Sequence, residues 1–497
     1  MKKQILFLLL LATSIVNAQT SKLKVTESNV YKDKVKARSI LAIHSTEANL
    51  TGIVRNSKKD FLFDVFDEKL NKIFSKVIES SRKEAYVGDV FYGDEMKFFT
   101  VFSPTKNERI VYAHVFNLKQ KSHKKEALFT ANVEKKQRLF ARNNKRETSV
   151  AISPNGDYFA IATDNIKKNS NSYTIRVFNT KTLKLVYKKA YQEHKERYFQ
   201  PNDLVIDNSA TVYALGKLFI DGRSLKKKGE ANYQFVLNKI TKDNVKDVTV
   251  DLTDDLHIKS LVISKVKNRL NLVGFYSERN VGRIKGGCNF KIDSNALTVL
   301  STNTTNLPID VYEDLYGYRK AKKKKKKGKE LSNFYIDYIL QDSKGNTYIL
   351  AEEFYITYNY VSTGVGGGYS VPVFHYDDIL ILKADASGNL DWGRSIFKRA
   401  LAPSYNAFLK NDELHVILNS GKNLTEKKDG RTKVSQGWLE SSALYDFVYQ
   451  SNGEVAYNKI QDNKGKTFYV PYYGNFNNEK FIMSSSGRKK KQFMILE

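Results

Sequence analysis

Residues 332–398 read SNFYIDYILQDSKGNTYILAEEFYITYNYVSTGVGGGYSVPVFHYDDILILKADASGNLDWGRSIFK, and this stretch predicts four antiparallel strands in a row. We expect the strands at Phe334–Leu340, Thr347–Tyr355, Asp378–Lys383 and Leu390–Ile396. Polar turns ending in Gly-Asn join the first pair and the last pair, and such turns are strong hairpin signals. A four-stranded meander is the unit from which β-propellers are built.

Weaker copies of this unit recur at a spacing of roughly 45–75 residues, a period that suits propeller blades. The clearest copy predicts strands at Ser149–Ile152, Tyr158–Thr163, Tyr173–Asn179 and Leu183–Tyr187. Its first turn, Ser-Pro-Asn-Gly-Asp-Tyr at 153–158, resembles the WD40-like and related repeats of secreted bacterial propellers. The resemblance implies a propeller over most of the mature chain. The Gly-His and Trp-Asp signatures of the WD40 family proper are missing, and Val-Phe-Asn occupies the position of the Trp-Asp pair.

The two ends of the chain together supply one unit. The last unit has only three expected strands, at Phe468–Tyr473, Lys480–Ser484 and Gln492–Leu496, and a short strand at Lys22–Thr26 can provide the fourth. Pairing the two ends would close the ring and remove the free sheet edges.

We therefore predict an all-β fold with a single propeller over residues 37–497, closed by a strand within residues 19–36. Eight four-stranded blades are expected. Seven blades with a terminus packed outside, or two separate β domains, are the alternatives, although no Pro-, Gly- or Ser-rich linker marks a boundary.

Residues 1–18 have the pattern of a secretory signal peptide. Lys2 and Lys3 precede the apolar run Ile5–Ile15, and the small residue Ala18 ends a cleavage site before Gln19. The alternative is an uncleaved anchor, but the run is short for a membrane span. We expect an exported protein, periplasmic or extracellular, with no membrane span after cleavage.

The formal net charge of +29 concentrates in particular loops. In a four-stranded blade, the loop between the second and third strands shares a face with the connection to the next blade. The basic residues gather in these loops, which predicts a cationic face that attracts a polyanion, an acidic glycan or an acidic protein. Solvation alone is the other explanation of the lysine run. The candidate binding residues are Arg223, Lys226, Lys227, Lys228, Arg279, Arg283, Arg319, Lys320, Lys322, Lys323, Lys324, Lys325, Lys326, Lys327 and Lys329.

The segment Ile356–Tyr376 predicts an unusual Gly- and Tyr-rich loop on the same face. Aromatic side chains of this kind stack on sugar rings or bases when basic neighbours hold phosphate or carboxylate. The alternative is a flexible hairpin that caps the blade. The candidate residues are Tyr358, Tyr360, Tyr369, His375 and Tyr376.

Sequence patterns of catalysis are scarce. The seven histidines form no His-Glu-x-x-His motif, and no Gly-x-Ser-x-Gly elbow is present, so we expect no metal, no cofactor and no catalytic residue. The lone cysteine, Cys288, is expected to be a packed residue. The sequence favours a secreted, non-enzymatic binding or scaffold propeller. One alternative is a glycan-active enzyme using Glu352, Glu353 and Asp377, and another is a structural envelope protein without a specific ligand.

Overall fold

The computed structural model describes most of the chain after residue 21. The predicted signal peptide and Arg279 lie outside the described residues. The described residues are 22–497 except 34, 36, 38, 58–59, 133–149, 167–170, 193–196, 229, 254–255, 267–268, 279–281, 363–367, 435–440, 464–467 and 487–489.

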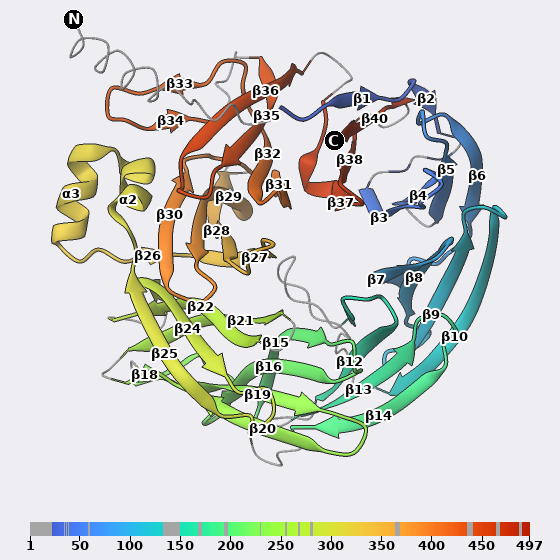
Figure 1. Cartoon of the computed structure of the whole chain (residues 1–497), viewed down its shortest axis with the longest axis horizontal. Helices are drawn as coiled ribbons and strands as arrows, with labels where there is room; N and C mark the ends of the chain where they lie inside the picture. The colour runs from blue at the N-terminus through green and yellow to red at the C-terminus, as the bar shows by residue number, and fades with distance from the viewer. Residues whose placement is uncertain are drawn as a thin grey trace, which may run out of the picture.

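Eight four-stranded antiparallel sheets surround a central axis among the described residues (Figure 1). We number these sheets as blades 1 to 8. Blade 1 is β3–β6 (Ser39–Ser45, Thr51–Asn56, Phe61–Phe66, Lys72–Ile78), and blade 2 is β7–β10 (Glu84–Tyr92, Glu95–Phe102, Glu108–Asn117, Ser122–Asn132). Blade 3 is β11–β14 (Val150–Ile152, Tyr158–Ile166, Asn171–Asn179, Leu185–Tyr191), and blade 4 is β15, β16, β19 and β20 (Phe199–Ile206, Val212–Phe219, Tyr233–Ile240, Val245–Val250).

The second half of the ring has the same construction. Blade 5 is β21, β22, β24 and β25 (His257–Val266, Arg269–Ser277, Gly286–Ile292, Val299–Asn306), and blade 6 is β27–β30 (Phe334–Gln341, Thr347–Ser362, Gly368–Ala384, Leu390–Ile396). Blade 7 is β31, β32, β35 and β36 (Tyr405–Lys410, Glu413–Gly421, Ser442–Tyr449, Val455–Asp462). Blade 8 is β37, β38, β40 and β1 (Asn475–Asn477, Lys480–Ser484, Phe493–Leu496, Val25–Glu27). The predicted propeller class is confirmed.

Four short two-stranded sheets lie outside the blades among the described residues. They are β2 with β39 (Tyr31–Lys32, Lys490–Lys491), β17 with β18 (Lys226–Lys227, Glu230–Ala231), β23 with β26 (Arg283–Ile284, Leu331–Ser332) and β33 with β34 (Thr425–Glu426, Thr432–Lys433). All four are antiparallel.

The N-terminal strand closes the ring as the sequence predicts. In blade 8, β1 pairs with β40, so that Val25 lies opposite Leu496. The backbones of Lys24 and Glu497 add two hydrogen bonds, of 2.8 and 3.0 Å. The first strand of this blade was predicted wrongly at Phe468–Tyr473. Pro471, which cannot donate a backbone hydrogen bond, begins a 3₁₀ turn there, and the strand follows at β37.

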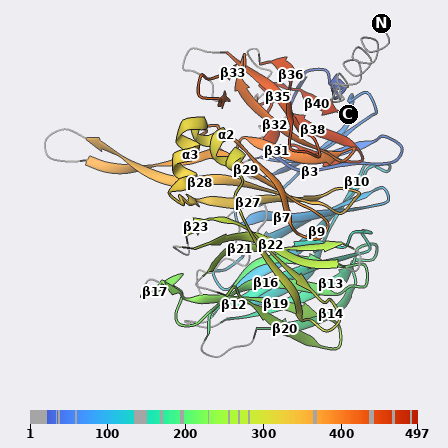
Figure 2. The same ribbon diagram turned by 60° about the vertical axis from the view of Figure 1, so that its left-hand side comes forward.

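Blade 6 carries the largest departure from the predicted strands. The prediction of a Gly- and Tyr-rich loop at Ile356–Tyr376 is wrong, because β28 and β29 continue far beyond their neighbouring strands as a two-stranded ribbon. Figure 2 shows the ribbon projecting from one face of the ring. Its arms are rich in Tyr, Val, Ile and Thr, the residues that favour strands.

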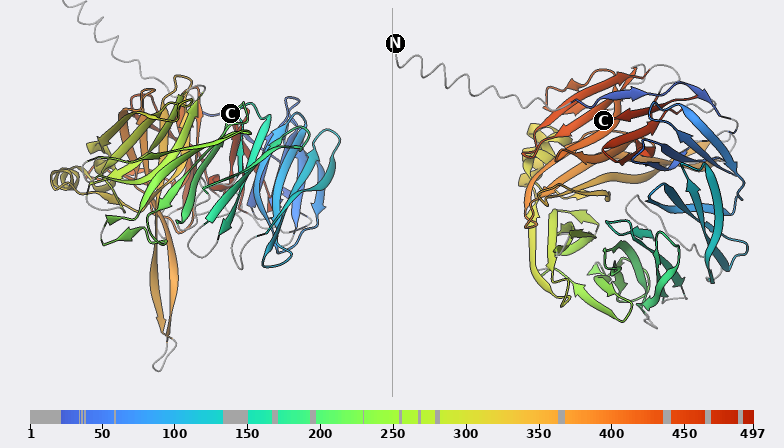
Figure 3. Two further views of the ribbon diagram at one scale, coloured as in Figure 1. Left: turned by 90° about the horizontal axis from the view of Figure 1, so that it is seen from below. Right: turned by 45° about the vertical axis from the view of Figure 1, so that its right-hand side comes forward.

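The connection from blade 5 to blade 6 contains two helices, where the sequence pattern predicted none. They are α2 (Ile309–Tyr316) and α3 (Tyr318–Lys326). We expected this basic connection on the loop face, but Figures 1 and 3 place the helices at the outer rim, beside β30. Lysine and alanine are good helix formers, and α2 supplies Val311 and Leu315, four residues apart, to the core.

Apolar side chains pack between neighbouring blades. One cluster joins blades 4 and 5 through residues such as Phe235, Leu261 and Phe290, which are at most 1% exposed. Cys288 belongs to the same cluster, so the prediction of a packed cysteine is confirmed, and burial raises the pKa of its thiol.

No helix in the part of the chain that the structure describes is both long and apolar enough to span a bilayer.

Candidate functional site: a basic helix, a ribbon and a central pocket

The basic helix α3 is fastened to the ring through α2. Ala321 is the fully buried residue of α3, and its N–H donates to the carbonyl of Gly317 at 2.9 Å. On α2, Asp314 accepts two hydrogen bonds from the guanidinium of Arg394 in β30, at 2.8 and 2.9 Å. Two-point pairing of this kind fixes orientation as well as distance. The helix pair is therefore held firmly against blade 6.

Blade 7 supports the same helix pair from the other side. The N–H of Tyr318 donates to the carbonyl of Asp429 at 3.1 Å, in the turn between β33 and β34. Arg431 ion-pairs with Asp429 at 2.7 Å and donates to the carbonyl of Leu315 at 3.4 Å. The two helices thus bridge two blades.

Seven of the nine residues of α3 are basic, and most of their side chains face solvent. Burial, followed by the charges of Lys329 and Lys320, lowers the pKa of Lys324. The last turn holds four lysines, where the helix dipole favours positive charge. Among the described residues, no carboxylate lies within 4.0 Å of the ammonium groups of Lys322, Lys323, Lys325 and Lys326. The predicted cations Arg319, Lys320, Lys327 and Lys329 are also exposed.

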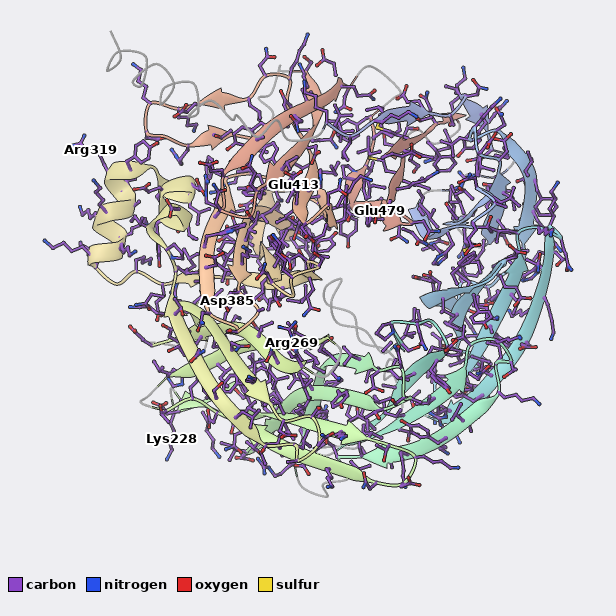
Figure 4. The ribbon with its side chains drawn as sticks, viewed as in Figure 1. Lys228, Arg269, Arg319, Asp385, Glu413 and Glu479 are labelled. Carbon is purple, nitrogen blue, oxygen red and sulfur yellow. The ribbon has the colours of Figure 1, made fainter. Side chains whose placement is uncertain are left out.

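The remaining predicted cations lie on other blades. Arg223 is 4.4 Å from the centre of the Tyr198 ring, and Lys227 ion-pairs with Asp221. Lys226 and Lys228 are exposed in the β17–β18 hairpin, and Arg283 is exposed in β23. Figure 4 shows Arg319 and Lys228 over different parts of the ring. The structure does not gather these side chains around α3.

The ribbon divides the predicted aromatic residues between its two faces. Successive side chains of a strand point to opposite faces. By this alternation and the register of the two strands, Tyr358 and Tyr376 lie on the same face of the ribbon. His375 lies on the opposite face, where it stacks on Tyr355 with ring centres 4.5 Å apart and hydrogen-bonds Thr357 at 2.8 Å. The side chains of Tyr360 and Tyr369 lie outside the described part of the structure. The predicted residues therefore do not form a single aromatic site.

A group of carboxylates lies at the root of the ribbon, where a bulge interrupts the β28–β29 pairing. Burial raises the pKa of Asp378 to about 7, and Glu353 and Asp377 add to the shift while Arg399 opposes it. Burial likewise raises the pKa of Glu353. Arg399 approaches Asp378 at 2.6 Å and Asp377 at 3.6 Å.

Two of the three carboxylates singled out in the sequence accept side-chain hydrogen bonds in this group. Glu352 accepts a 2.7 Å hydrogen bond from the ammonium of Lys398, and both side chains are buried. Asp377 accepts a 2.7 Å hydrogen bond from the Tyr355 hydroxyl. These contacts stabilise the base of the ribbon.

A pocket of about 650 Å³ opens at the centre of the ring. Its carboxylates belong to the innermost strands and have partners: Asp89 contacts His44 at 2.6 Å, and Asp337 accepts from Tyr405 at 3.0 Å. Asp203 accepts from the N–H of Ile263 at 2.7 Å and so links blades 4 and 5. The pocket is acidic, in contrast to the rim helix.

Sequence reasoning missed a buried hydrogen-bonded chain in blade 2. His114 contacts His123 at 3.1 Å through one ring nitrogen and Glu84 at 3.1 Å through the other. Pairing of β9 with β10 sets His114 opposite Lys125, which brings His123 near diagonally. Only the hairpin register could have revealed this contact.

The described residues contain no group of three or more His, Cys, Asp or Glu side chains suited to a metal ion.

Comparison with known proteins gives similarity of fold alone. No family model matches the chain, and no curated protein matches it. Solved structures similar to it include the propeller of Dos1, at 8% identity and a TM-score of 0.41, covering 94% of each chain. The WD40 domain of SCAP from fission yeast has 8% identity and a TM-score of 0.38, covering 94% of this chain and 98% of that one. The β-propeller domain of the Trilobed protease from Pyrococcus furiosus has 10% identity and a TM-score of 0.35, covering 74% and 99%.

Proposed function

We propose that this chain is a binding propeller that holds a polyanionic partner on the exposed side of α3. One observation carries the proposal: a run of lysines forms an ordered helix, packed on the ring, with four ammonium groups that have no carboxylate of the described residues within ion-pair distance. Charge runs of this kind are usually solvated and irregular. Here Ala321 and the blade 7 turn hold the run in place.

Order in α3 favours binding for an entropic reason. A disordered segment loses roughly 1–2 kcal/mol of backbone entropy per residue when a partner immobilises it, and a preformed helix has already lost that freedom. Nine helical residues span ~13 Å, so the cations present a short, dense positive surface. Carboxylate, sulfate or phosphate groups of an acidic glycan, nucleic acid or acidic protein would release counterions on contact.

Other parts of the chain support a binding role outside the cytoplasm. The signal-like residues 1–18 favour export, periplasmic or extracellular, and the basic hairpin at Lys226–Lys228 offers a second, smaller cationic surface. Detection of the processed chain in the periplasmic or extracellular fraction would test the proposed location.

A second candidate function is catalysis on a glycan at the root of the ribbon. The observation in its favour is the carboxyl group of Asp378, whose pKa is raised to about 7 chiefly by burial. A carboxylic acid that stays protonated near neutral pH is suited to protonate a leaving group. Release of reducing sugar from acidic and neutral glycans, lost in Asp378→Asn, would support this candidate over the binding propeller.

The experiment that tests the first proposal is elution from immobilised heparin in a salt gradient. In the test variant, Lys322, Lys323, Lys325 and Lys326 are replaced by Ser. The matched control replaces four exposed lysines in turns between third and fourth strands, Lys119, Lys121, Lys181 and Lys184. We expect the test variant to elute at clearly lower salt than the control. Equal shifts would mean that net charge alone causes retention, as in an envelope protein without a specific ligand.

A further inference from the structure

The ribbon of blade 6 differs from the rest of the chain in its charge. Residues 354–376 contain no Lys, Arg, Asp or Glu, whereas 27% of the whole chain is charged. Figure 3 shows the ribbon standing clear of the ring. An isolated two-stranded ribbon is only marginally stable in water, which makes an exposed, uncharged one a candidate for association.

Both edges of the ribbon lose their neighbours at its root. Pairing with β27 ends at Phe334 opposite Glu353, and pairing with β30 ends at Ile396 opposite Ile379. Further out, the N–H of Phe354 donates to the carbonyl of Asn333 and that of Tyr376 donates to the carbonyl of Ala400, each at 2.8 Å. Beyond these caps, the described residues of the ribbon pair only with each other.

The alternation of an antiparallel pair identifies the outward-facing backbone groups. Because the N–H of Phe354 points outward, those of Ile356 and Tyr358 do so as well. On the other strand the same rule applies to Phe374 and Pro372, which pair with Ile356 and Tyr358. Each arm therefore presents a row of backbone groups at its edge.

Pro372 makes the two edges unequal. Proline has no N–H to donate, so it interrupts the outward row of β29 and blocks the addition of a strand there. The outward row of β28 contains neither proline nor a charged side chain. Only the β28 edge is therefore open to a further strand.

One face of the ribbon also leaves large apolar side chains in water. Ile356, Tyr358 and Phe374 are 40%, 68% and 45% exposed, and all three lie on the same face. A further strand beside β28 would extend this face, and its side chains would pack beside Ile356 and Tyr358. A lipid bilayer is not the expected partner of the ribbon, because unpaired backbone groups at a sheet edge do not enter the hydrocarbon region. Nucleic acid is also disfavoured, since the ribbon has no cation to hold its backbone.

We propose that β28 pairs with β28 of a second copy of this chain, antiparallel and around a two-fold axis, to form a four-stranded arm between two propellers. The pairing closes at two copies, because each outer edge then consists of β29 with its Pro372. The nine residues from Phe354 to Ser362 span ~30 Å, several times the Debye length of ~8 Å, so the two basic rings do not repel strongly.

The expected dimer is concentration-dependent. Three partly exposed side chains per copy cover much less than the ~1,600 Å² of a standard interface. The inference is independent of polyanion binding by α3, since it rests on other residues.

Cross-linking through a single introduced cysteine tests the proposal. The natural Cys288 is buried at 4% exposure, so a short thiol-specific cross-linker reports on the new residue. We expect Tyr358→Cys to yield a covalent dimer and Phe374→Cys, on the blocked edge, to yield far less. Equal cross-linking of the two variants would overturn the proposal, because it would mean random collision of exposed thiols.

Sedimentation equilibrium without cross-linking provides the second measurement. The mass of the wild-type chain should rise from one copy towards two with concentration, and Tyr358→Pro, which removes an outward N–H, should remain a monomer. Tyr358 is exposed, so the substitution leaves the ring folded, as circular dichroism would verify. A wild-type chain that stays monomeric at every concentration, whether or not it binds vesicles or other proteins, would contradict the pairing.

Discussion

The ammonium of Lys324 lies 4.1 Å from the centre of the Tyr316 ring, so one of the lysines of α3 fastens the helix to α2. A cation over an aromatic ring contributes about 0.5–1 kcal/mol at an exposed site. Together with buried Ala321, this contact turns a lysine run into an ordered surface. Order, rather than charge alone, is the feature that the proposed function depends on.

Ala321→Pro tests the role of order without changing charge. Proline removes the hydrogen bond from residue 321 to the Gly317 carbonyl and costs about 3 kcal/mol in a helix interior, so α3 should come away from the ring. We expect weaker retention on heparin with the melting temperature of the blades nearly unchanged. Retention equal to that of the wild type would show that a disordered run binds equally well.

Asp33→Ala should destabilise the folded chain. Asp33, only 1% exposed, makes two 2.7 Å hydrogen bonds with the fully buried guanidinium of Arg55. Removing the sole partner of a buried ion costs roughly 3–5 kcal/mol, and because Arg55 also ion-pairs with buried Asp64, the loss should lie below this range. Urea unfolding measures the loss, and Glu68→Ala, at an exposed turn, serves as the control and should change stability by less than about 0.5 kcal/mol.

The histidine chain in blade 2 should make stability depend on pH. Burial, then the charges of His114, Lys76 and Lys125, lowers the pKa of His123 from 6.5 to about 4. The unfolded chain therefore binds the proton first as pH falls, and stability is lost between about pH 6.5 and 4.

Urea unfolding at a series of pH values checks this prediction with His123→Phe. The variant should lack a decrease on the order of 1–3 kcal/mol between pH 7 and 4, and above pH 7 the two proteins should differ by a constant amount. Parallel curves over the whole range would contradict the role of His123.

Asp378 should have the opposite pH dependence. Burial raises its pKa from 3.8 to about 7, so the folded state keeps the proton that the unfolded chain loses first as pH rises. Its contribution is full below about pH 4 and is lost as pH rises to 7. Asp378→Asn should remove this dependence and stabilise the chain at pH 8 by on the order of 2–4 kcal/mol in urea unfolding. Lower stability of the variant at pH 8 would show that the 2.6 Å contact with Arg399 outweighs burial.

Local turn chemistry explains which parts of the fold the sequence predicts. In blade 3, the predicted strand Tyr158–Thr163 corresponds to β12, and Tyr173–Asn179 lies within β13. In blade 8, the pairing of Thr26 with Ile495 follows from the need to avoid an open edge. Turn signals within each blade and the need to pair every sheet edge were sufficient to predict these strands and the closure of the ring.

The site depended on information that local patterns do not contain. The glycines after Ser362 suggested a loop. The two arms nevertheless pair in register, from Phe354 opposite Tyr376 to Ser362 opposite Gly368. The lysine run has no apolar periodicity, and its order depends on Ala321 and on a turn of another blade. The carboxylates around Asp378 meet only because a bulge and Arg399 bring them together. Contacts with distant residues determine the order of α3 and the carboxylate group, and hairpin register determines the ribbon.

Binding at α3 is tested by the salt dependence of affinity for a fluorescent, highly sulfated oligosaccharide, measured by anisotropy. The logarithm of the association constant falls with the logarithm of salt concentration in proportion to the number of neutralised anionic groups. Replacing Lys322, Lys323, Lys325 and Lys326 by Ser is expected to lower both affinity and slope. The control at Lys119, Lys121, Lys181 and Lys184 is expected to retain the wild-type slope. Identical slopes for the two variants would contradict binding at α3.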